Sequence, residues 1–442
     1  MALGLHSACK ARLVASLEEH LPVVKVNKRR YVDYSSAVGL LTTDKILPRE
    51  GPVRQKLREF SDDQPFFEFT IDMIGRMLWI SEKYSMDAEE QPLVTHGVFK
   101  NISVVANHIV EAFDSLPWQY THTFRLPKDL GHELTSIISD YTLSREARVT
   151  QANEEFITKY PLITGSENLD ALFATGTLLF PKPPEWDPNA IYFQTQTEGY
   201  VSQYGSAKTS VDAESTLRTF FGLGLALRIF KYERSVSLYR LRDSCYVHKF
   251  RSGAWNLDAK IDMEVDLSEA ISHIMLNIPQ SVTKGEVKLK RAWIIGNLIK
   301  IGMCVANADK AQRVLLASRW LFDSHIGQNE LLSFVQMMVA IEILLGDRER
   351  SDLLGLGELL KNRCAYLIGK SQAQRDSILR DFGGIYDVRS QIVHRGKSRL
   401  SSTERRKFFQ LQWMCIRVIQ EEMELLEKDV QNHQTSGVRQ SS

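Results

Sequence analysis

Near residue 288 the hydrophobic pattern of the chain changes from mixed to helical. From about Lys288 to Asp429 strand-like alternation is scarce, and amphipathic or apolar helical segments follow one another. One of them, predicted at 330–345, starts after the candidate N-cap Asn329 and stops at Gly346. This third of the chain is therefore expected to form a helical bundle.

The other predicted helices of this region also have readable ends. Two predicted capping boxes open helices, one from Ser371 to Gln374 and one from Ser401 to Glu404. The predicted spans are about 311–323, about 352–368, a helix from 371 that is interrupted at Gly383-Gly384 and continues over 385–394, and a last helix from 401.

Before residue 288 the pattern mixes helix and strand. Aromatic and β-branched residues predict strands at 190–201 and 235–248, and helical spacing predicts a helix at 212–232. The predicted fold class is α+β, with a mixed α/β N-terminal region followed by an all-α bundle. The predicted domains are a regulatory or sensing region of one or two subdomains over 1–290, a bundle over 291–430, and a disordered tail over 431–442.

Composition bounds the class of protein. Apolar residues make up 43% and charged residues 25% of the 442, as in ordinary globular proteins. There is no signal-peptide h-region and no 18-residue apolar run, so no membrane partner is expected. Five scattered cysteines form no CxxC pair, which is typical of thiols in a reducing compartment. We expect a cytoplasmic protein.

The net charge of +1 hides an uneven distribution. Residues 291–442 carry 22 basic and 17 acidic side chains, whereas residues 1–290 carry 33 and 37. The segment from Arg389 to Lys407 contains seven basic residues and one acidic residue, Glu404. This basic run is either a solvated loop and helix start or a track for a phosphate backbone. The candidate RNA-binding residues are Arg395, Lys397, Arg399, Arg405, Arg406 and Lys407.

The sequence contains no complete motif for binding a nucleotide, a dinucleotide or a metal. The two Gly-Lys-Ser triplets lack the first glycine of a phosphate loop, and two Gly-x-Gly pairs lack the third glycine of a dinucleotide fingerprint. No HxxxH or HxH pair occurs, and Asp262, Glu264 and Asp266 have no further ligand at suitable spacing. We expect no metal and no cofactor, and a metal hydrolase hidden in the N-terminal region has no sequence support.

An Arg-x4-His pair, Arg389 and His394, lies in the helix that ends before Gly396. An arginine followed by a histidine after four, five or six residues occurs four times in the chain, against roughly two expected by chance, so only context selects this pair. The helix end gives it a rigid platform, and the partial negative charge there favours imidazolium. The two residues are five positions apart, so on an ideal helix their side chains point about 140° apart around the helix axis. They converge on one phosphate only if the helix end is distorted or a second chain contributes.

Glu342 lies on a helix face among apolar neighbours, including Val335 and Val339. A carboxylate buried there needs a cationic or hydrogen-bonding partner. Arg389 is the predicted partner. The alternative is that Glu342 lies at the edge of the bundle and reaches water.

Three segments together resemble the HEPN superfamily, specifically the ApeA-like HEPN domains associated with abortive infection against phage. They are Arg319-Trp-Leu-Phe-Asp, Ala340-Ile-Glu-Ile-Leu-Leu-Gly and Ile385-Tyr-Asp-Val-Arg-Ser-Gln-Ile-Val-His, within about Lys288 to Asp429. Arg395 follows His394 where relatives often have glycine, so the exit of that helix differs.

The resemblance implies a metal-independent endoribonuclease whose cleft is built by a homodimer. His394 would then act as acid or base, Arg389 would stabilise the phosphate, and Glu342 and Ser390 would orient them. It implies RNA as substrate, a role in antiviral defence, and a phage-derived trigger or regulatory partner for the N-terminal region. The alternative is a non-catalytic HEPN module that binds RNA, a nucleotide or a partner protein.

Overall fold

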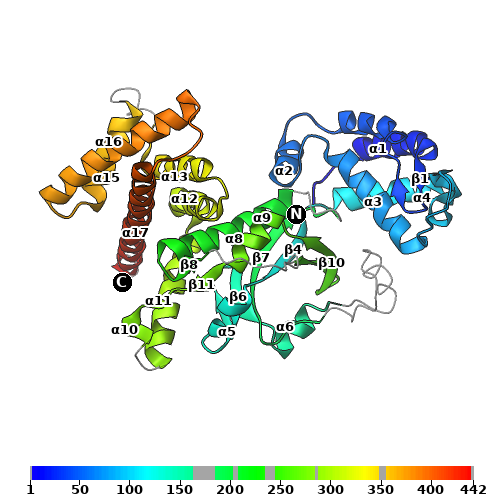
Figure 1. Ribbon diagram of the computed structural model, residues 1–442. Helices are drawn as coiled ribbons and strands as arrows, with labels where there is room; N and C mark the ends of the chain where they lie inside the picture. Colours follow the sequence, from blue (N-terminus) through cyan, green and yellow to red (C-terminus); the bar gives the residue numbers. More distant parts are fainter. Residues whose placement is uncertain are drawn as a thin grey trace.

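The protein is described from a computed structural model over residues 2–162, 185–202, 208–233, 244–283, 287–347 and 355–439. It is elongated, with the N-terminal helices at one end, a sheet in the middle and the C-terminal helices at the other end (Figure 1). A mixed α+β region with antiparallel sheets is followed by an all-helical region, which confirms the predicted fold class. Among the described residues, no helix has the length and apolar character that a bilayer crossing requires.

The N-terminal end, up to residue 116, has a second hydrophobic core, to which Trp118 and Tyr200 from the central region also contribute. Its helices pack around Phe113, whose ring contacts those of Phe66 and Phe69 edge to face. Three short strands form a small antiparallel sheet in the order β2-β1-β3. The elements are α1 (Ser7–His20), β1 (Lys25–Asn27), β2 (Tyr31–Val32), α2 (Pro52–Phe60), α3 (Pro65–Ser81), β3 (Gln91–Pro92), α4 (Ile102–Asp114) and short 3-10 turns at Leu21–Val23, Val38–Ile46, Leu93–Thr95 and Gly97–Lys100.

A six-stranded antiparallel sheet forms the centre, in the order β10-β9-β4-β7-β6-β5. Its strands are β4 (Trp118–Arg125), β5 (Asp140–Thr142), β6 (Ala147–Gln151), β7 (Ile191–Gly199), β9 (Ser244–Arg251) and β10 (Ala254–Asp262). The predicted strand at 190–201 is confirmed as β7. The strand predicted at 235–248 begins at Ser244 within the described residues, and positions 235–243 lie outside them.

Helix α8 (Lys208–Ala226) covers one face of the sheet, where the rings of Phe220 and Phe193 lie 5.0 Å apart. The predicted helix at 212–232 is wrong in its last turns. Arg228 adopts a left-handed conformation, and the N–H of Ile229 bonds back to the carbonyl of Gly224 at 3.0 Å. This Schellman end, made without glycine at the left-handed position, terminates α8 before β8 (Phe230–Tyr232).

Short elements complete this region. They are α5 (Lys128–Thr135), α6 (Glu154–Lys159), α9 (Val265–Ser272), α10 (Gln280–Thr283) and β11 (Ile274–Leu276), which pairs with β8.

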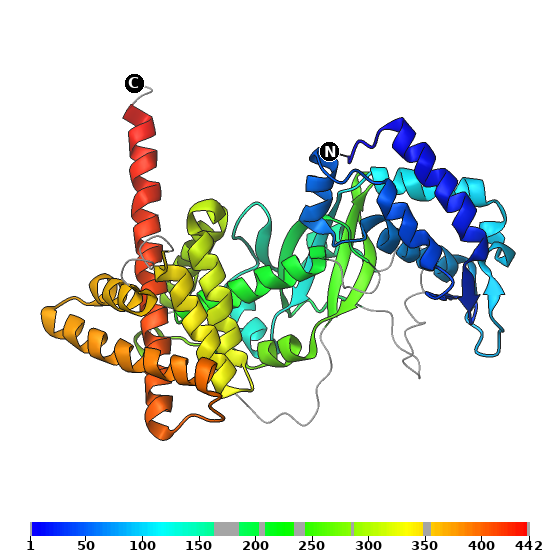
Figure 2. The same cartoon turned by 90° about the horizontal axis from the view of Figure 1, so that it is seen from above.

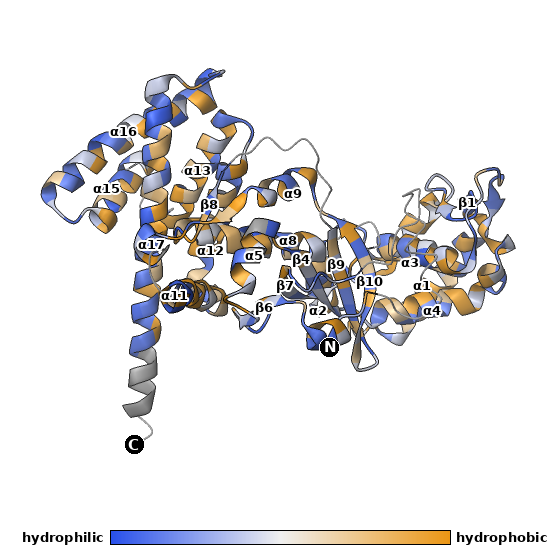
Figure 3. Cartoon of the chain, turned by 60° about the horizontal axis from the view of Figure 1, so that its bottom comes forward, coloured by the Kyte–Doolittle hydropathy of each residue, from blue (hydrophilic) through white to orange (hydrophobic). Residues whose placement is uncertain are grey.

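The C-terminal region consists of α11 (Val287–Ala306), α12 (Ala308–Ile326), α13 (Glu330–Leu345), α15 (Leu356–Ile368), α16 (Gln372–Arg395) and α17 (Ser402–Arg439). Figure 2 shows α15 and α16 side by side, projecting beside the long α17. Bands of hydrophilic and hydrophobic residues alternate along α17 (Figure 3). Of the disordered tail predicted over 431–442, residues 431–439 have a helical backbone as the end of α17, and positions 440–442 lie outside the described residues.

The predicted interruption at Gly383-Gly384 is wrong, because α16 is continuous. Two glycines inside a helix cost roughly 1 kcal/mol each relative to alanine. Phe382 and Ile385, which flank them, are both buried completely. Their burial offsets that cost, since a fully buried apolar side chain contributes about 1.5–3 kcal/mol.

One hydrophobic core spans the sheet and the C-terminal helices. Helix α8 crosses α12 so closely that a Cβ at Gly222 would lie 1.8 Å from the carbonyl oxygen of Ser318. Arg319 of α12 donates a hydrogen bond to the hydroxyl of Ser215 on α8 at 2.9 Å. The domain boundary near residue 290 stays a prediction, and apolar packing is continuous across it.

Candidate active site

The helix α13 carries Glu342 and has the ends that the sequence predicts. The side chain of Asn329 accepts hydrogen bonds from the backbone of Leu331 and Leu332, at 2.9 and 3.2 Å. At the other end, the N–H of Gly346 closes on the carbonyl of Glu342 at 2.8 Å. These caps fix the length of α13 and thereby the position of Glu342 in its last turn.

Glu342 contacts Arg389 of α16, as predicted. Glu342 Oε1 and Arg389 Nη2 are 3.6 Å apart, and the two side chains are 24% and 25% exposed. The distance is that of an ion pair and exceeds a hydrogen bond, and Oε1 is buried without a hydrogen-bond partner among the described residues. Burial raises the pKa of Glu342, and the positive charge of Arg389 opposes that rise.

Arg389 also lies over the ring of Tyr386, one turn earlier on α16, at 5.9 Å from the ring centroid. This cation–π contact holds the guanidinium on the side of α16 that faces α13. The sequence interpretation gave Tyr386 no role. The i, i+3 spacing of the two residues was the available signal.

His394 is exposed in the last turn of α16, before Gly396 ends the helix in the left-handed conformation. It makes no hydrogen bond or ion pair with another described residue. Because α16 is regular to Arg395, Arg389 and His394 point about 140° apart. One chain therefore does not bring them onto a single phosphate, and Ser390 lies half-buried between their two directions.

The predicted basic run divides into two sets. Besides Arg389, which pairs with Glu342, three of its members have partners within the chain, namely Lys397 with Glu404 at 2.9 Å, Arg405 with Glu330 at 3.0 Å, and Lys407 with the carbonyl of Gly384 at 3.0 Å. Arg395, Arg399 and Arg406 are exposed and form no ion pair with a described residue. The structure thus leaves these three arginines free to meet a ligand.

The capping box predicted at Ser401 and Glu404 is confirmed. The N–H of Ser401 donates to Glu404 at 2.8 Å, and the Ser401 hydroxyl accepts from the N–H of Glu404 at 3.4 Å. Partial desolvation favours the neutral acid, but hydrogen bonds from Ser401 and Lys397 outweigh it and lower the pKa of Glu404 to about 2. This ion pair occupies Lys397, so Lys397 fits an RNA contact less well than its arginine neighbours.

No group of three or more His, Cys, Asp or Glu side chains in the described part of the chain could hold a metal ion. Of the three acids Asp262, Glu264 and Asp266, Asp262 ends β10 and Glu264 pairs with Arg218 at 2.9 Å. Cys364 and Cys415 are buried, and burial raises the pKa of both thiols, that of Cys364 to about 12. Such thiols are poor nucleophiles near neutral pH.

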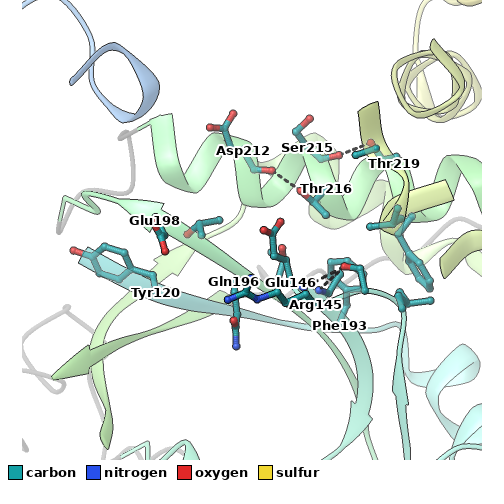
Figure 4. A pocket seen from close by; sticks show the side chains of 18 of the residues that line it. Tyr120, Arg145, Glu146, Phe193, Gln196, Glu198, Asp212, Ser215, Thr216 and Thr219 are labelled. Atoms are coloured by element: carbon teal, nitrogen blue, oxygen red, sulfur yellow. Dashed lines mark hydrogen bonds between the residues drawn. The ribbon is translucent and has the colours of Figure 1, made fainter. Parts of the chain in front are cut away.

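The structure also contains a solvent-open cavity of about 700 Å³, between the sheet and α8 (Figure 4). The cavity was not predicted from the sequence, because the residues that line it come from segments as far apart as Gln119 and Leu315. Only the tertiary packing of β7, α8 and α12 brings those segments together.

No protein-family model matches the chain, and neither a curated protein nor a solved structure matches it.

Proposed function

We propose that the chain is a HEPN-type, metal-independent endoribonuclease that acts as a homodimer. The observation that carries the proposal is the Glu342–Arg389 contact between α13 and α16, close to the exposed His394 at the end of α16. The resemblance in sequence falls on the same residues, and in the structure they lie on two neighbouring helices.

The chemistry requires three contributions. Attack of a ribose 2′-OH on its own phosphodiester needs a proton acceptor, a proton donor for the leaving oxygen and positive charge on the phosphate. His394 supplies the acceptor or the donor, because an imidazole is able to serve as either near neutral pH. Arg389 supplies the charge. Glu342 and Tyr386 hold its guanidinium, and Ser390 orients the groups beside it.

A second copy of the chain completes the site. Arg389 and His394 of one copy diverge, so two copies that pair through α13 and α16 supply one cleft with two arginines and two histidines. An apolar stripe supports that pairing surface. Leu332, Val335 and Val339 share one face of α13 with Glu342 and are half-buried or exposed, and Val393 on α16 is 48% exposed.

Three exposed arginines, Arg395, Arg399 and Arg406, follow the catalytic helix end and form the proposed track for the RNA backbone. Phosphate contacts of this kind position a strand without reading its sequence. The proposal extends to a cytoplasmic effector of antiviral, abortive-infection type, in which residues 1–290 sense a trigger.

A second candidate function is a non-catalytic HEPN module that binds RNA, a nucleotide or a partner protein. The exposed His394 favours it, because no described residue fixes the orientation of its imidazole. In that case the Glu342–Arg389 pair is structural, and RNA binds without being cleaved.

The test uses the purified full chain and a 5′-labelled RNA in the presence of EDTA. We expect cleavage by the wild type and a loss of about 100-fold or more in His394→Ala and in Arg389→Ala, the scale of acid–base and electrostatic contributions. His108→Ala and Arg380→Ala, exposed residues on α4 and α16, are the matched controls and should keep full activity. Cleavage by both site variants at the wild-type rate would overturn the proposal.

A further inference from the structure

The cavity opens where β7 extends beyond its neighbour β6. Their pairing ends at Thr195 and Ala147, followed by one more hydrogen bond from the N–H of Gln196 to the carbonyl of Glu146 at 2.7 Å. The described walls are β4 and β7, the turn between β5 and β6 with the start of β6, Trp255 of β10, α8, and part of α11 and α12 (Figure 4). At about 700 Å³ it falls within the range of roughly 300–1,000 Å³ that is usual for small-molecule sites.

Carboxylates outnumber cations among the described lining residues. Glu146, Glu198 and Asp212 line the cavity together with one basic residue, Arg145. None of the three acids forms an ion pair with another described residue, and Glu198 accepts only a long hydrogen bond of 3.4 Å from Gln119. Burial raises the pKa of Asp212, whereas the positive charges of Lys208 and Arg319 lower it, and Arg319 donates to Ser215 in the same wall. Glu146 and Glu198 are therefore the carboxylates that a positively charged ligand meets most freely, and Asp212 is shared with these two cations.

The hydroxyls of α8 add acceptors. Thr216 donates its proton to the carbonyl of Asp212 at 2.9 Å, and Thr219 donates to the carbonyl of Ser215 at 2.9 Å. Each of these threonine hydroxyls has used its donor inside the helix, so only its lone pairs face a ligand. These two hydroxyls therefore offer a ligand acceptors only, which suits a ligand that carries N–H groups.

Apolar side chains lie between these polar groups. Leu143, Phe193, Phe220, Val305 and Leu315 form parts of the wall. A compact inorganic cation would leave this surface wet, whereas a chain of methylenes would cover it. The required ligand thus alternates ammonium groups with short apolar spacers.

We propose that this cavity binds a linear aliphatic polyamine, with its ammonium groups at Glu146, Glu198 and Asp212. The methylenes of the polyamine lie on the apolar wall. Because strands of the sheet and residues of α12 both line the cavity, and α12 packs on α8 at Gly222, a bound polyamine stabilises the sheet and the helical region together. This proposal stands independently of the ribonuclease activity.

Isothermal titration calorimetry of the full chain with spermidine at about 150 mM salt tests the proposal. We expect one site per chain, binding at least tenfold weaker in Asp212→Asn and in Glu198→Gln, and no measurable binding in the double variant. Glu18→Gln, an exposed acid on α1, is the matched control and should bind as the wild type does. Circular dichroism of each variant verifies that the fold is unchanged.

Two comparison ligands separate specific binding from simple charge attraction. The uncharged 1,8-octanediol and Mg²⁺ should each bind at least tenfold more weakly than spermidine. Binding of spermidine with several sites per chain, or binding that the two cavity variants leave unchanged, would overturn the proposal. Equal binding of Mg²⁺ would also overturn it, since the spacers would then contribute nothing.

Discussion

Replacing Arg389 by methionine removes the positive charge beside Glu342 and keeps most of the side-chain volume. At the observed 3.6 Å, two unit charges attract by about 4–5 kcal/mol in an effective dielectric of about 20. Both side chains remain about one-quarter exposed, so hydration and side-chain ordering reduce the net effect. Exposed pairs contribute about 0–1 kcal/mol, and breaking a buried pair costs about 3–5 kcal/mol. We expect an interaction free energy of about 1–2 kcal/mol.

The loss should depend on pH. Burial raises the pKa of Glu342 above its usual value, and the positive charge of Arg389 makes that rise smaller. Without Arg389 the pKa rises further. A carboxyl whose pKa is raised by folding stabilises the folded state at low pH, and that contribution is lost as the pH rises through the folded-state pKa. Arg389→Met should therefore destabilise the protein more at pH 7.5 than at pH 4.

The assay is a double-mutant cycle of Arg389→Met and Glu342→Gln, with urea unfolding at both pH values. Removing the carboxylate in the Arg389→Met background should recover part of the stability at pH 7.5. Additive effects, within about 0.3–0.5 kcal/mol, would refute the reasoning, because they would show that the two side chains do not interact. An equal loss at both pH values would refute it too.

Three further expectations concern packing and charge. Gly222→Ala should lower the free energy of unfolding by at least about 1–3 kcal/mol, because its Cβ would meet the Ser318 carbonyl. In thermal unfolding, Gly383→Ala, which meets nothing within 4 Å, should instead stabilise by about 0.5–1 kcal/mol. Arg76→Met should cost about 3–5 kcal/mol and expose the N-terminal end to limited proteolysis, because it leaves the buried Asp72 and the half-buried Asp258 without their guanidinium. A wild-type digestion pattern would contradict that last expectation.

Local signals predicted the elements whose ends carry them. Asn329 and Gly346 gave the bounds of α13, and the Ser401–Glu404 capping box gave the start of α17. Arg228 shows the limit of such signals, because a non-glycine residue takes the left-handed position that ends α8. Gly383 and Gly384 predicted a break in α16. The helix is continuous, because the side chains that flank the two glycines are buried.

The candidate site was predictable only in part. The apolar neighbours of Glu342 implied a cationic partner, and Arg389 is that partner. Charge counts alone did not show that Lys397, Arg405 and Lys407 are engaged within the chain, because their partners depend on how α13, α16 and α17 pack. The cavity beside α8 could not be predicted for the same reason, because the residues that line it lie far from one another in the sequence.

The most direct test of the central proposal, a cleft shared by two chains, is complementation between inactive variants. Arg389→Ala and His394→Ala are unfolded together, refolded as a mixture and assayed for RNA cleavage in EDTA. In a mixed dimer one chain retains Arg389 and the other retains His394, so the mixture should regain activity that neither variant has alone. A mixture that forms mixed dimers and stays as inactive as its components would contradict the shared cleft.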